Sequence, residues 1–286
     1  MILSKIINDR VLALFDLRTT RASSWRNASE KTRLLESLAV SSVAQARIIR
    51  LARLLRPHNA IGQSKIRLGS NHDGGYICLN DFDAIAAAFS FGVAQNDDWD
   101  LALAERGIDV QQFDHTIDAP PHTHQNLYFY KRKIVPISER GLDGETISDL
   151  LEKRVKKERD SVILKIDIEG DEWKVFNELA SQDMDTFSQV ICEFHGFSAV
   201  LNDIWYERAL TVLERLDRAF AVVHVHGNNF LPWMILGGVP FPELLEVTYA
   251  SRSRYEFKPA DEIFPTLLDS PNDPNVPDFF LGRFKF

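Results

Sequence analysis

The sequence predicts an α/β protein built on a mostly parallel sheet with helices on both faces, and three observations predict it. From about residue 61, short apolar runs alternate with amphipathic segments of helical spacing, as in parallel strands joined by helices. The run Val162–Ile168 is rich in β-branched residues and ends abruptly in carboxylates and a glycine, as a buried parallel strand does at its carboxyl end. Two later runs, Gln189–Phe194 and Phe220–Val225, also end in polar clusters.

Length and composition limit the functions open to this chain. It has 286 residues, of which 45% are hydrophobic and 26% charged, enough for one large core or for one domain with an appendage. The formal net charge of −8 argues against broad nucleic-acid binding, which usually needs a basic face. We therefore expect no nucleic-acid partner.

The cysteines and the apolar segments predict a cytoplasmic protein without a membrane span. Cys78 and Cys192 both lie in apolar runs and are interpreted as buried free thiols rather than as a disulfide. No apolar stretch approaches the ~20 residues that cross a bilayer. Charged residues interrupt the apolar residues of 1–21, so this segment lacks the apolar core of a signal peptide.

The first 60 residues are predicted to form a helical N-terminal extension, followed by one domain over 61–286. Apolar residues keep helical spacing through 34–38 and 48–55. Pro57 predicts that a helix ends before it. We expect the extension to pack on the main domain or on a second subunit, and the second arrangement would give a homodimer.

The first half of the domain is predicted to start with two short strands around a turn-rich loop. An apolar run then ends in a glycine turn, and Gly107 is the expected C-cap of the next helix. The predicted strands are Ile66–Gly69, Tyr76–Leu79, Ala86–Val93, Val110–Phe113 and Lys133–Ile137, and the predicted helices are Trp99–Arg106 and Asp143–Arg159.

The second half continues the alternation and ends in strands that we expect to be antiparallel. Three prolines in Ser270–Asp278 predict a loop between the last two strands. The predicted strands are Val162–Ile168, Gln189–Phe194, Phe220–Val225, Leu244–Tyr249 and Phe279–Phe286, and the predicted helices are Trp173–Ala180 and Trp205–Ala219.

Polar pairs follow three of the predicted strands, and they form the first candidate site. Residues two apart in a strand share a face, and ligands bind at the carboxyl edge of open α/β sheets. Carboxylates and imidazoles gathered there could hold a divalent metal or supply a general base. The alternative is that each acid caps the next helix and each histidine bonds a backbone carbonyl. The pairs are Asp167 with Glu169, Glu193 with His195, and His224 with His226.

A glycine turn and a later acid form the second candidate site. In Ser90–Trp99 a strand meets a turn at Gly92 and then a helix, which lets a ligand approach the backbone and the helix N-terminus. About twenty residues later Asp114 ends the next strand, where an acid can bind ribose hydroxyls. Together they favour a nucleoside ligand over a purely structural turn, although the dinucleotide signature Gly-x-Gly-x-x-Gly is missing.

The third candidate site is Asp73-Gly74-Gly75-Tyr76 with Arg67 upstream. Paired glycines expose backbone N–H groups, and Arg67 could bind a ligand carboxylate in a fork geometry. A plain Gly-Gly hairpin between two strands is the alternative, and the sequence does not favour either.

These stretches resemble the FkbM-like methyltransferases, most closely the branch that includes methyltransferase-like protein 24. The resemblance covers most of residues 61 to 250, and the order and spacing of its motifs make it specific. The matching stretches are RLGSNHDGGY (67–76), FSFGVAQNDDWD (89–100), FDHTI (113–117), LKIDIEGDEW (164–173), VICEFHG (190–196) and HVHGNN (224–229).

The resemblance implies a Rossmann-like class I methyltransferase fold with a seven-stranded sheet, one strand of it antiparallel, and S-adenosylmethionine bound at the carboxyl edge. It implies that Gly92 lies beside the amino-acid part of the cofactor, Asp114 at its ribose and Asp167 beside the methyl donor. One glycine in the first loop, where many class I enzymes have two or three, departs from the pattern. Further cofactor contacts are expected from Asp73, Gly74, Val93, Asn96 and His115.

The implied function is O-methylation of a hydroxyl on a carbohydrate, glycan or related small molecule. An aliphatic hydroxyl needs a base or a metal to react at neutral pH. Our hypothesis is that Asp167, Glu193 and His226 bind Mg²⁺ or Mn²⁺ while His195 is the general base; without metal, His195 or Asp167 would accept the proton. The alternatives are a metal-dependent hydrolase that uses the same residues, or a non-catalytic nucleoside-binding module.

Overall fold

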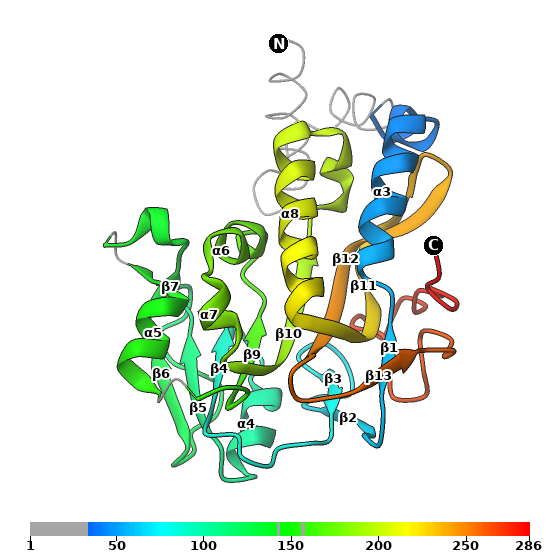
Figure 1. Cartoon of the computed structure of the whole chain (residues 1–286). Helices are drawn as coiled ribbons and strands as arrows, with labels where there is room; N and C mark the ends of the chain where they lie inside the picture. The colour runs from blue at the N-terminus through cyan, green and yellow to red at the C-terminus, as the bar shows by residue number, and fades with distance from the viewer. Residues whose placement is uncertain (1–33, 142–143, 156–157) are drawn as a thin grey trace.

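A seven-stranded sheet forms the centre of the computed structural model, which describes residues 34–141, 144–155 and 158–286 (Figure 1). The strand order is β11-β12-β10-β9-β4-β5-β6. The strands are β4 (Ala87–Phe91), β5 (Asp109–Phe113), β6 (Leu127–Tyr130), β9 (Val162–Ile166), β10 (Phe187–His195), β11 (Phe220–Leu236) and β12 (Val239–Ser251).

The sheet is mostly parallel, as predicted. Each neighbouring pair from β6 through β5, β4 and β9 to β10 is parallel. Only β12 runs against its neighbours, β10 and β11. Every residue of β4 and β9 is buried, because both faces of these central strands are covered, and this explains their continuous apolar runs. The Rossmann-like α/β architecture is therefore confirmed.

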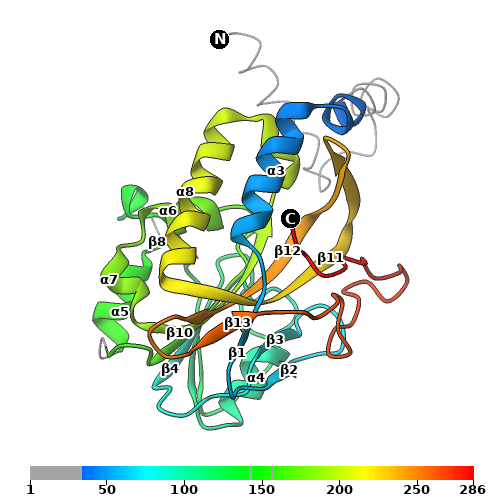
Figure 2. The same ribbon diagram turned by 45° about the vertical axis from the view of Figure 1, so that its right-hand side comes forward.

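Helices cover both faces. On one face, α3 (Ser42–Leu54) and α8 (Asp203–Ala219) lie side by side, with α6 (Glu172–Glu178) beside α8 (Figures 1 and 2). On the other face, α4 (Asp98–Ala104) packs with the hairpin of β2 (Lys65–Leu68) and β3 (Tyr76–Leu79). Successive side chains of β9 point to opposite faces of the sheet. Leu164 belongs to the core under α8, whereas Ile163 belongs to the core under α4.

The described part of the predicted N-terminal extension contains helix α3, which packs on the domain. The Ser41 hydroxyl caps α3 by accepting a hydrogen bond from Ala44 N at 3.2 Å. Ile48 and Leu51 are fully buried in the core shared with α8. The helix ends at Leu54, before Pro57, as the proline predicts. Residues 1–33 of the predicted extension lie outside the described residues, and the domain division at residue 60 stays a prediction.

Two predicted elements are shorter in the structure. Helix α5 spans Ile147–Arg154 instead of Asp143–Arg159, because Thr146 caps it by accepting from Asp149 N at 3.2 Å; residues 143 and 156–157 lie outside the described residues. The predicted strand 133–137 is reduced to β7 (Lys133–Ile134), which pairs with β8 (Gly144–Glu145).

The predicted strand Phe279–Phe286 is wrong. Its alternating aromatic residues contact the domain, but they do not pair with a neighbouring strand. Within residues 260–286, the only β pairing is an isolated bridge between Phe264 and Gly282. Phe284 packs against Phe241, with ring centroids 5.9 Å apart. The alternation therefore reflects packing of an irregular segment on β12, and apolar period alone cannot distinguish this from a strand.

Two pairings were missed. The aromatic segment Leu127–Tyr130 is the edge strand β6, where Tyr130 stacks on Phe113 at 5.0 Å. The short strands β1 (His58–Ala60) and β13 (Phe257–Pro259) pair with each other in a separate sheet. Strands this short carry little periodic signal in a sequence.

The C-terminal segment is irregular over 270–278, as predicted, and buried polar contacts hold it against β11. His224 Nε2 lies 2.8 Å from Asp269 Oδ1, and His226 Nε2 lies 3.0 Å from Asp278 Oδ1. The amide of Asn229 donates to the carbonyl of Val276 at 2.9 Å.

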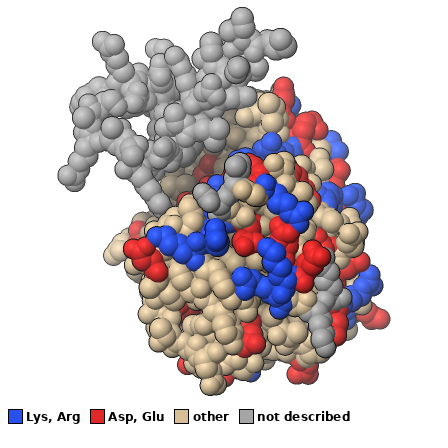
Figure 3. All heavy atoms as spheres, turned by 90° about the vertical axis from the view of Figure 1, so that its left-hand side faces the viewer, with Lys and Arg blue, Asp and Glu red and all other residues tan. Residues whose placement is uncertain are grey.

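On the face that carries α5, Lys and Arg side chains alternate with Asp and Glu (Figure 3). Ion pairs such as Lys153–Glu145 at 3.1 Å and Lys133–Asp171 at 2.9 Å lie there, so this face has no purely basic patch. Among the described residues, no helix has both the length and the apolar character needed to cross a bilayer.

Candidate active site

The site lies at the carboxyl ends of β9 and β10, on the sheet face that meets the β2–β3 hairpin. Asp167 directly follows β9, and its N–H continues the ladder by donating to Phe91 O at 3.0 Å. Glu193 and His195 are the last polar residues of β10. Because β9 and β10 are parallel neighbours, their ends bring these side chains together.

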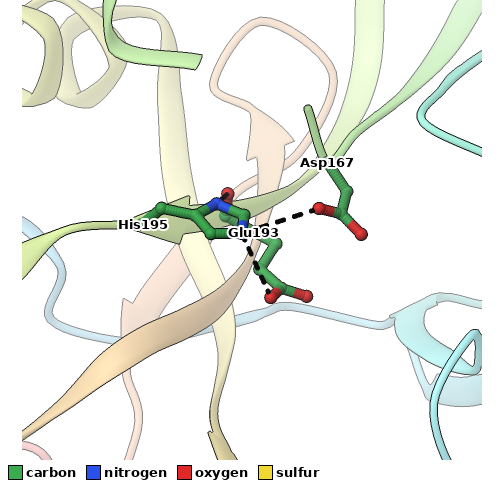
Figure 4. A group of neighbouring side chains, drawn as sticks. All are labelled: Asp167, Glu193 and His195. Carbon is green, nitrogen blue, oxygen red and sulfur yellow. Dashed lines mark hydrogen bonds and ion pairs between the residues drawn. The ribbon is translucent and has the colours of Figure 1, made fainter. Parts of the chain in front are cut away.

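Asp167, Glu193 and His195 form one group of possible metal ligands (Figure 4). His195 Nε2 lies 3.9 Å from Asp167 Oδ1 and 3.6 Å from Glu193 Oε1. One ligand atom from each residue lies within 4.8 Å of the others, and the described residues contain no second such group. The expectation that the ends of β9 and β10 meet around His195 therefore agrees with this geometry.

His226 lies outside this group, so the structure does not bring it together with Asp167 and Glu193 as the predicted metal site requires. Glu193 of β10 lies opposite Glu246 of β12, and Glu246 lies opposite His226 of β11. The strand β12 therefore lies between His226 and Glu193. Its Nδ1 is 3.0 Å from Glu246 Oε2 and its Nε2 is 3.0 Å from Asp278 Oδ1. Both ring nitrogens of His226 thus lie beside carboxylates. The histidine that lies beside Asp167 and Glu193 is His195.

The charge balance of the group favours a cation. Burial raises the pKa of Asp167 to about 6, against the opposing effects of Lys165 and His195. Burial and the charge of Asp167 raise the pKa of Glu193 well above its usual range. Although burial acts to lower the pKa of His195, the carboxylates around it raise that pKa well above its ordinary value. Carboxylates whose pKa values are raised in this way are stabilised in their charged forms when a cation binds.

Gly92 brings the end of β4 against the end of β9. Its φ is +79°, and a Cβ at this position would overlap the carbonyl oxygen of Asp167 and lie 2.8 Å from its carbonyl carbon. Lys165 Nζ donates to the carbonyl of Gly92. The glycine is thus required by the close approach of Asp167, whatever ligand the turn binds.

Asp114 meets the glycine turn, as its position after β5 predicts. Its Oδ2 accepts from Val93 N at 2.9 Å and from Ala94 N at 2.8 Å. Its Oδ1 accepts from Thr116 N at 2.7 Å and from the Thr116 hydroxyl at 2.6 Å. Four donors of the chain therefore occupy the roughly four lone-pair sites of this carboxylate. Asp114 braces the turn here, its contact with ribose stays a prediction, and the adjacent His115 is exposed.

The loop between β2 and β3 joins two antiparallel strands, which is the hairpin that the sequence analysis gave as the alternative to a ligand site. Arg67 Nε donates to Ser70 O at 2.9 Å and its Nη2 donates to His72 O at 2.8 Å, so the guanidinium holds the loop. The loop also touches the glycine turn, because Asn96 Nδ2 donates to Asp73 O at 2.8 Å. A Cβ on Gly74 would lie 2.5 Å from Asn96 Cγ. The second and third candidate sites are therefore one assembly.

Two residues of the site, Asn228 and Glu172, were given no role by the sequence analysis, and Tyr76 was named in the third candidate site without its contact to Asp167. The Tyr76 hydroxyl donates to Asp167 Oδ2 at 3.4 Å. Asn228 Nδ2 donates to Glu193 Oε1 at 3.2 Å. Glu172 Oε1 lies 3.3 Å from His195 Nδ1. All three lie in stretches that resemble the family, so their presence in DGGY, HGNN and EGDEW was the available signal.

A family model described as Methyltransferase FkbM domain matches residues 57–217, which is more than half of the chain. The matched range includes the glycine turn, Asp114 and the group of Asp167, Glu193 and His195, whereas His226 and the C-terminal segment lie beyond it. No curated protein matches the sequence.

Proposed function

The chain belongs to the methyltransferase FkbM domain family, and on that premise we propose that it is an S-adenosylmethionine-dependent O-methyltransferase whose acceptor is a hydroxyl of a carbohydrate, glycan or related small molecule. The observation that carries the proposal is the group of Asp167, Glu193 and His195 beside the Gly92 turn. A transferase for hydroxyls needs both a cofactor site and a means of removing the hydroxyl proton, and these two features are adjacent.

The residues of the turn and the hairpin loop fit a positively charged cofactor. Burial raises the pKa of Asp73, as it does that of Asp167, although the positive charge of Lys165 acts against this at both carboxylates. A sulfonium or an ammonium group beside these carboxylates would stabilise their charged forms further. S-adenosylmethionine supplies an electrophilic methyl group when bound. The proposed contacts are Asp73, Gly74, Gly92, Val93, Asn96, Asp114, His115 and Asp167.

We propose that Asp167, Glu193 and His195 hold a divalent metal. Two carboxylates and an imidazole suit Mn²⁺, and Mg²⁺ binds carboxylates. A divalent ion would make a nearby hydroxyl more acidic. Asp167 has one oxygen toward His195 and the other toward the Tyr76 hydroxyl, so it can bind a cation with one and accept a proton with the other. We therefore assign proton acceptance to Asp167 and metal binding to His195, which revises the base expected from the sequence.

Calorimetric titration with S-adenosylmethionine and S-adenosylhomocysteine tests the proposed function. We expect both to bind with micromolar dissociation constants, near −8 kcal/mol, because Asp73 and Asp167 lie beside the Gly92 turn in the proposed cofactor site. Absence of binding would favour the metal-dependent hydrolase. Binding without methyl transfer to any of a panel of sugars and polyols would favour the non-catalytic nucleoside-binding module.

Metal removal distinguishes the ligand set of the structure from the set expected from the sequence. We expect EDTA to abolish turnover and Mn²⁺ to restore it. His195→Gln should weaken Mn²⁺ binding, measured by electron paramagnetic resonance, by 10-fold or more on an order-of-magnitude basis. His226→Gln is the matched control and should leave Mn²⁺ affinity within about two-fold, since His226 already contacts Glu246 and Asp278. Full turnover in EDTA would contradict metal assistance.

A further inference from the structure

Glu172, the first residue of α6, has a fully buried side chain that holds the turn after Asp167. Its Oε1 accepts from Ile168 N at 2.6 Å, and its Oε2 accepts from Gly170 N at 2.9 Å. This turn is strained, since Glu169 has a φ of +61°. A carboxylate that satisfies both N–H groups stabilises the turn and so fixes the direction in which Asp167 leaves β9.

The same carboxylate faces the imidazole of His195. Glu172 Oε1 lies 3.3 Å from His195 Nδ1, and the Glu193 carbonyl oxygen lies 3.2 Å from that nitrogen. The acceptors beside Nδ1 lie closer than the carboxylate oxygens beside Nε2, which are 3.6 and 3.9 Å away. Nδ1 is therefore the nitrogen that carries the hydrogen in the neutral ring. Nε2, which faces Asp167 and Glu193, is left with its lone pair.

The next residue of α6 holds the backbone of His195. Trp173 Nε1 donates to His195 O at 2.7 Å, and its ring stacks on Phe194 with centroids 4.4 Å apart. The first two residues of α6 therefore both contact the end of β10: Glu172 lies beside the side chain of His195, and Trp173 bonds its carbonyl. These contacts fix the backbone of His195 and place its Nδ1 beside the Glu172 carboxylate.

We propose that Glu172 is a positioning residue that sets Asp167 and His195 in the one arrangement able to bind a divalent cation. It holds Asp167 through the Ile168–Gly170 turn and keeps His195 in the Nδ1–H form, so that Nε2 is the ligand atom. A carboxylate behind a metal-binding histidine raises the basicity of the ring and fixes its tautomer. The inference rests on the proposed metal site, and it adds a residue outside that ligand set.

The first test is Mn²⁺ affinity in Glu172→Gln. Glutamine has nearly the same shape, but its NH₂ group must replace either Oε2, where it faces the Gly170 N–H, or Oε1, where it faces the Ile168 N–H and the hydrogen on Nδ1. At least one of the three contacts therefore fails. We expect the dissociation constant for Mn²⁺ to rise about 10- to 100-fold, with the circular dichroism spectrum unchanged. An affinity within two-fold of the wild type would overturn the proposal.

Glu243→Gln is the matched control. Glu243 is also buried, and it accepts from Ser198 N at 2.7 Å and from the Ser198 hydroxyl at 2.8 Å. The Glu243→Gln variant therefore loses a buried carboxylate that accepts from a backbone and a side-chain donor, as Glu172 does, but that makes no hydrogen bond to His195. We expect this variant to keep wild-type Mn²⁺ affinity. An equal loss in both variants would show that Glu172 acts only through general stability or charge, and would overturn the proposal.

A second measurement needs neither a variant nor a metal. The ¹⁵N chemical shifts of the His195 ring, recorded in the wild-type protein at a pH where the ring is neutral, report its tautomer. We expect the Nδ1–H form, and an Nε2–H form would overturn the proposal even if Glu172→Gln fails to fold. A wild-type protein that shows Nδ1–H but binds no Mn²⁺ would contradict the proposed metal site and leave the positioning role of Glu172 supported.

Discussion

Replacing Gly92 with alanine is expected to destabilise the protein by about 4 kcal/mol or more. The φ of +79° alone strains an alanine, at a cost of about 1–2 kcal/mol. The new Cβ would also overlap the carbonyl oxygen of Asp167, so β4 and β9 would have to separate at the centre of the sheet. Urea denaturation followed by circular dichroism measures the difference in the free energy of unfolding.

Gly107→Ala separates the two effects. Gly107 has a similar φ of +83°, but a Cβ there would meet no atom within 4 Å. This variant should show only the cost of the backbone conformation. If both variants lose the same free energy of unfolding, the contact between Gly92 and Asp167 is not what requires the glycine, and our account of the turn is wrong.

Asp167→Asn is expected to lower turnover by about 10²- to 10⁴-fold. Asparagine has nearly the same shape and can still accept from the Tyr76 hydroxyl, so the site should keep its form. It cannot accept a proton at neutral pH, and its amide is a weaker ligand for a divalent cation than a carboxylate. The measurement is the initial rate of methyl transfer, together with Mn²⁺ affinity.

Asp171→Asn provides the control for this variant. Asp171 lies in the same stretch but pairs with Lys133 at 2.9 Å and with Lys174 at 2.7 Å, away from the ligand group. Its loss should change turnover by less than about two-fold, since ion pairs near the surface contribute little and neither lysine belongs to the ligand group. Normal turnover in Asp167→Asn would exclude the residue as the proton acceptor.

The alternation of apolar runs and helical segments was enough to predict the central sheet, because burial on both faces leaves a continuous apolar signal in strands such as β9. The edge strand β6 lacks that signal, and the C-terminal aromatic residues imitate it. Which of these segments forms a ladder depends on a partner strand elsewhere in the chain. No local pattern contains that information.

The candidate site divides in the same way. The sequence by itself determined that carboxylates and imidazoles lie directly after β9, in the last residues of β10 and within β11, because a polar residue within an apolar run is visible without a structure. Only the tertiary structure decided that Glu193 and His195 meet Asp167, while His226 bonds Glu246 and Asp278. Strand order and the path of residues 269–278 set these partners. A histidine's role follows from which acid lies within about 3–4 Å of each ring nitrogen, and that distance is a property of the folded chain.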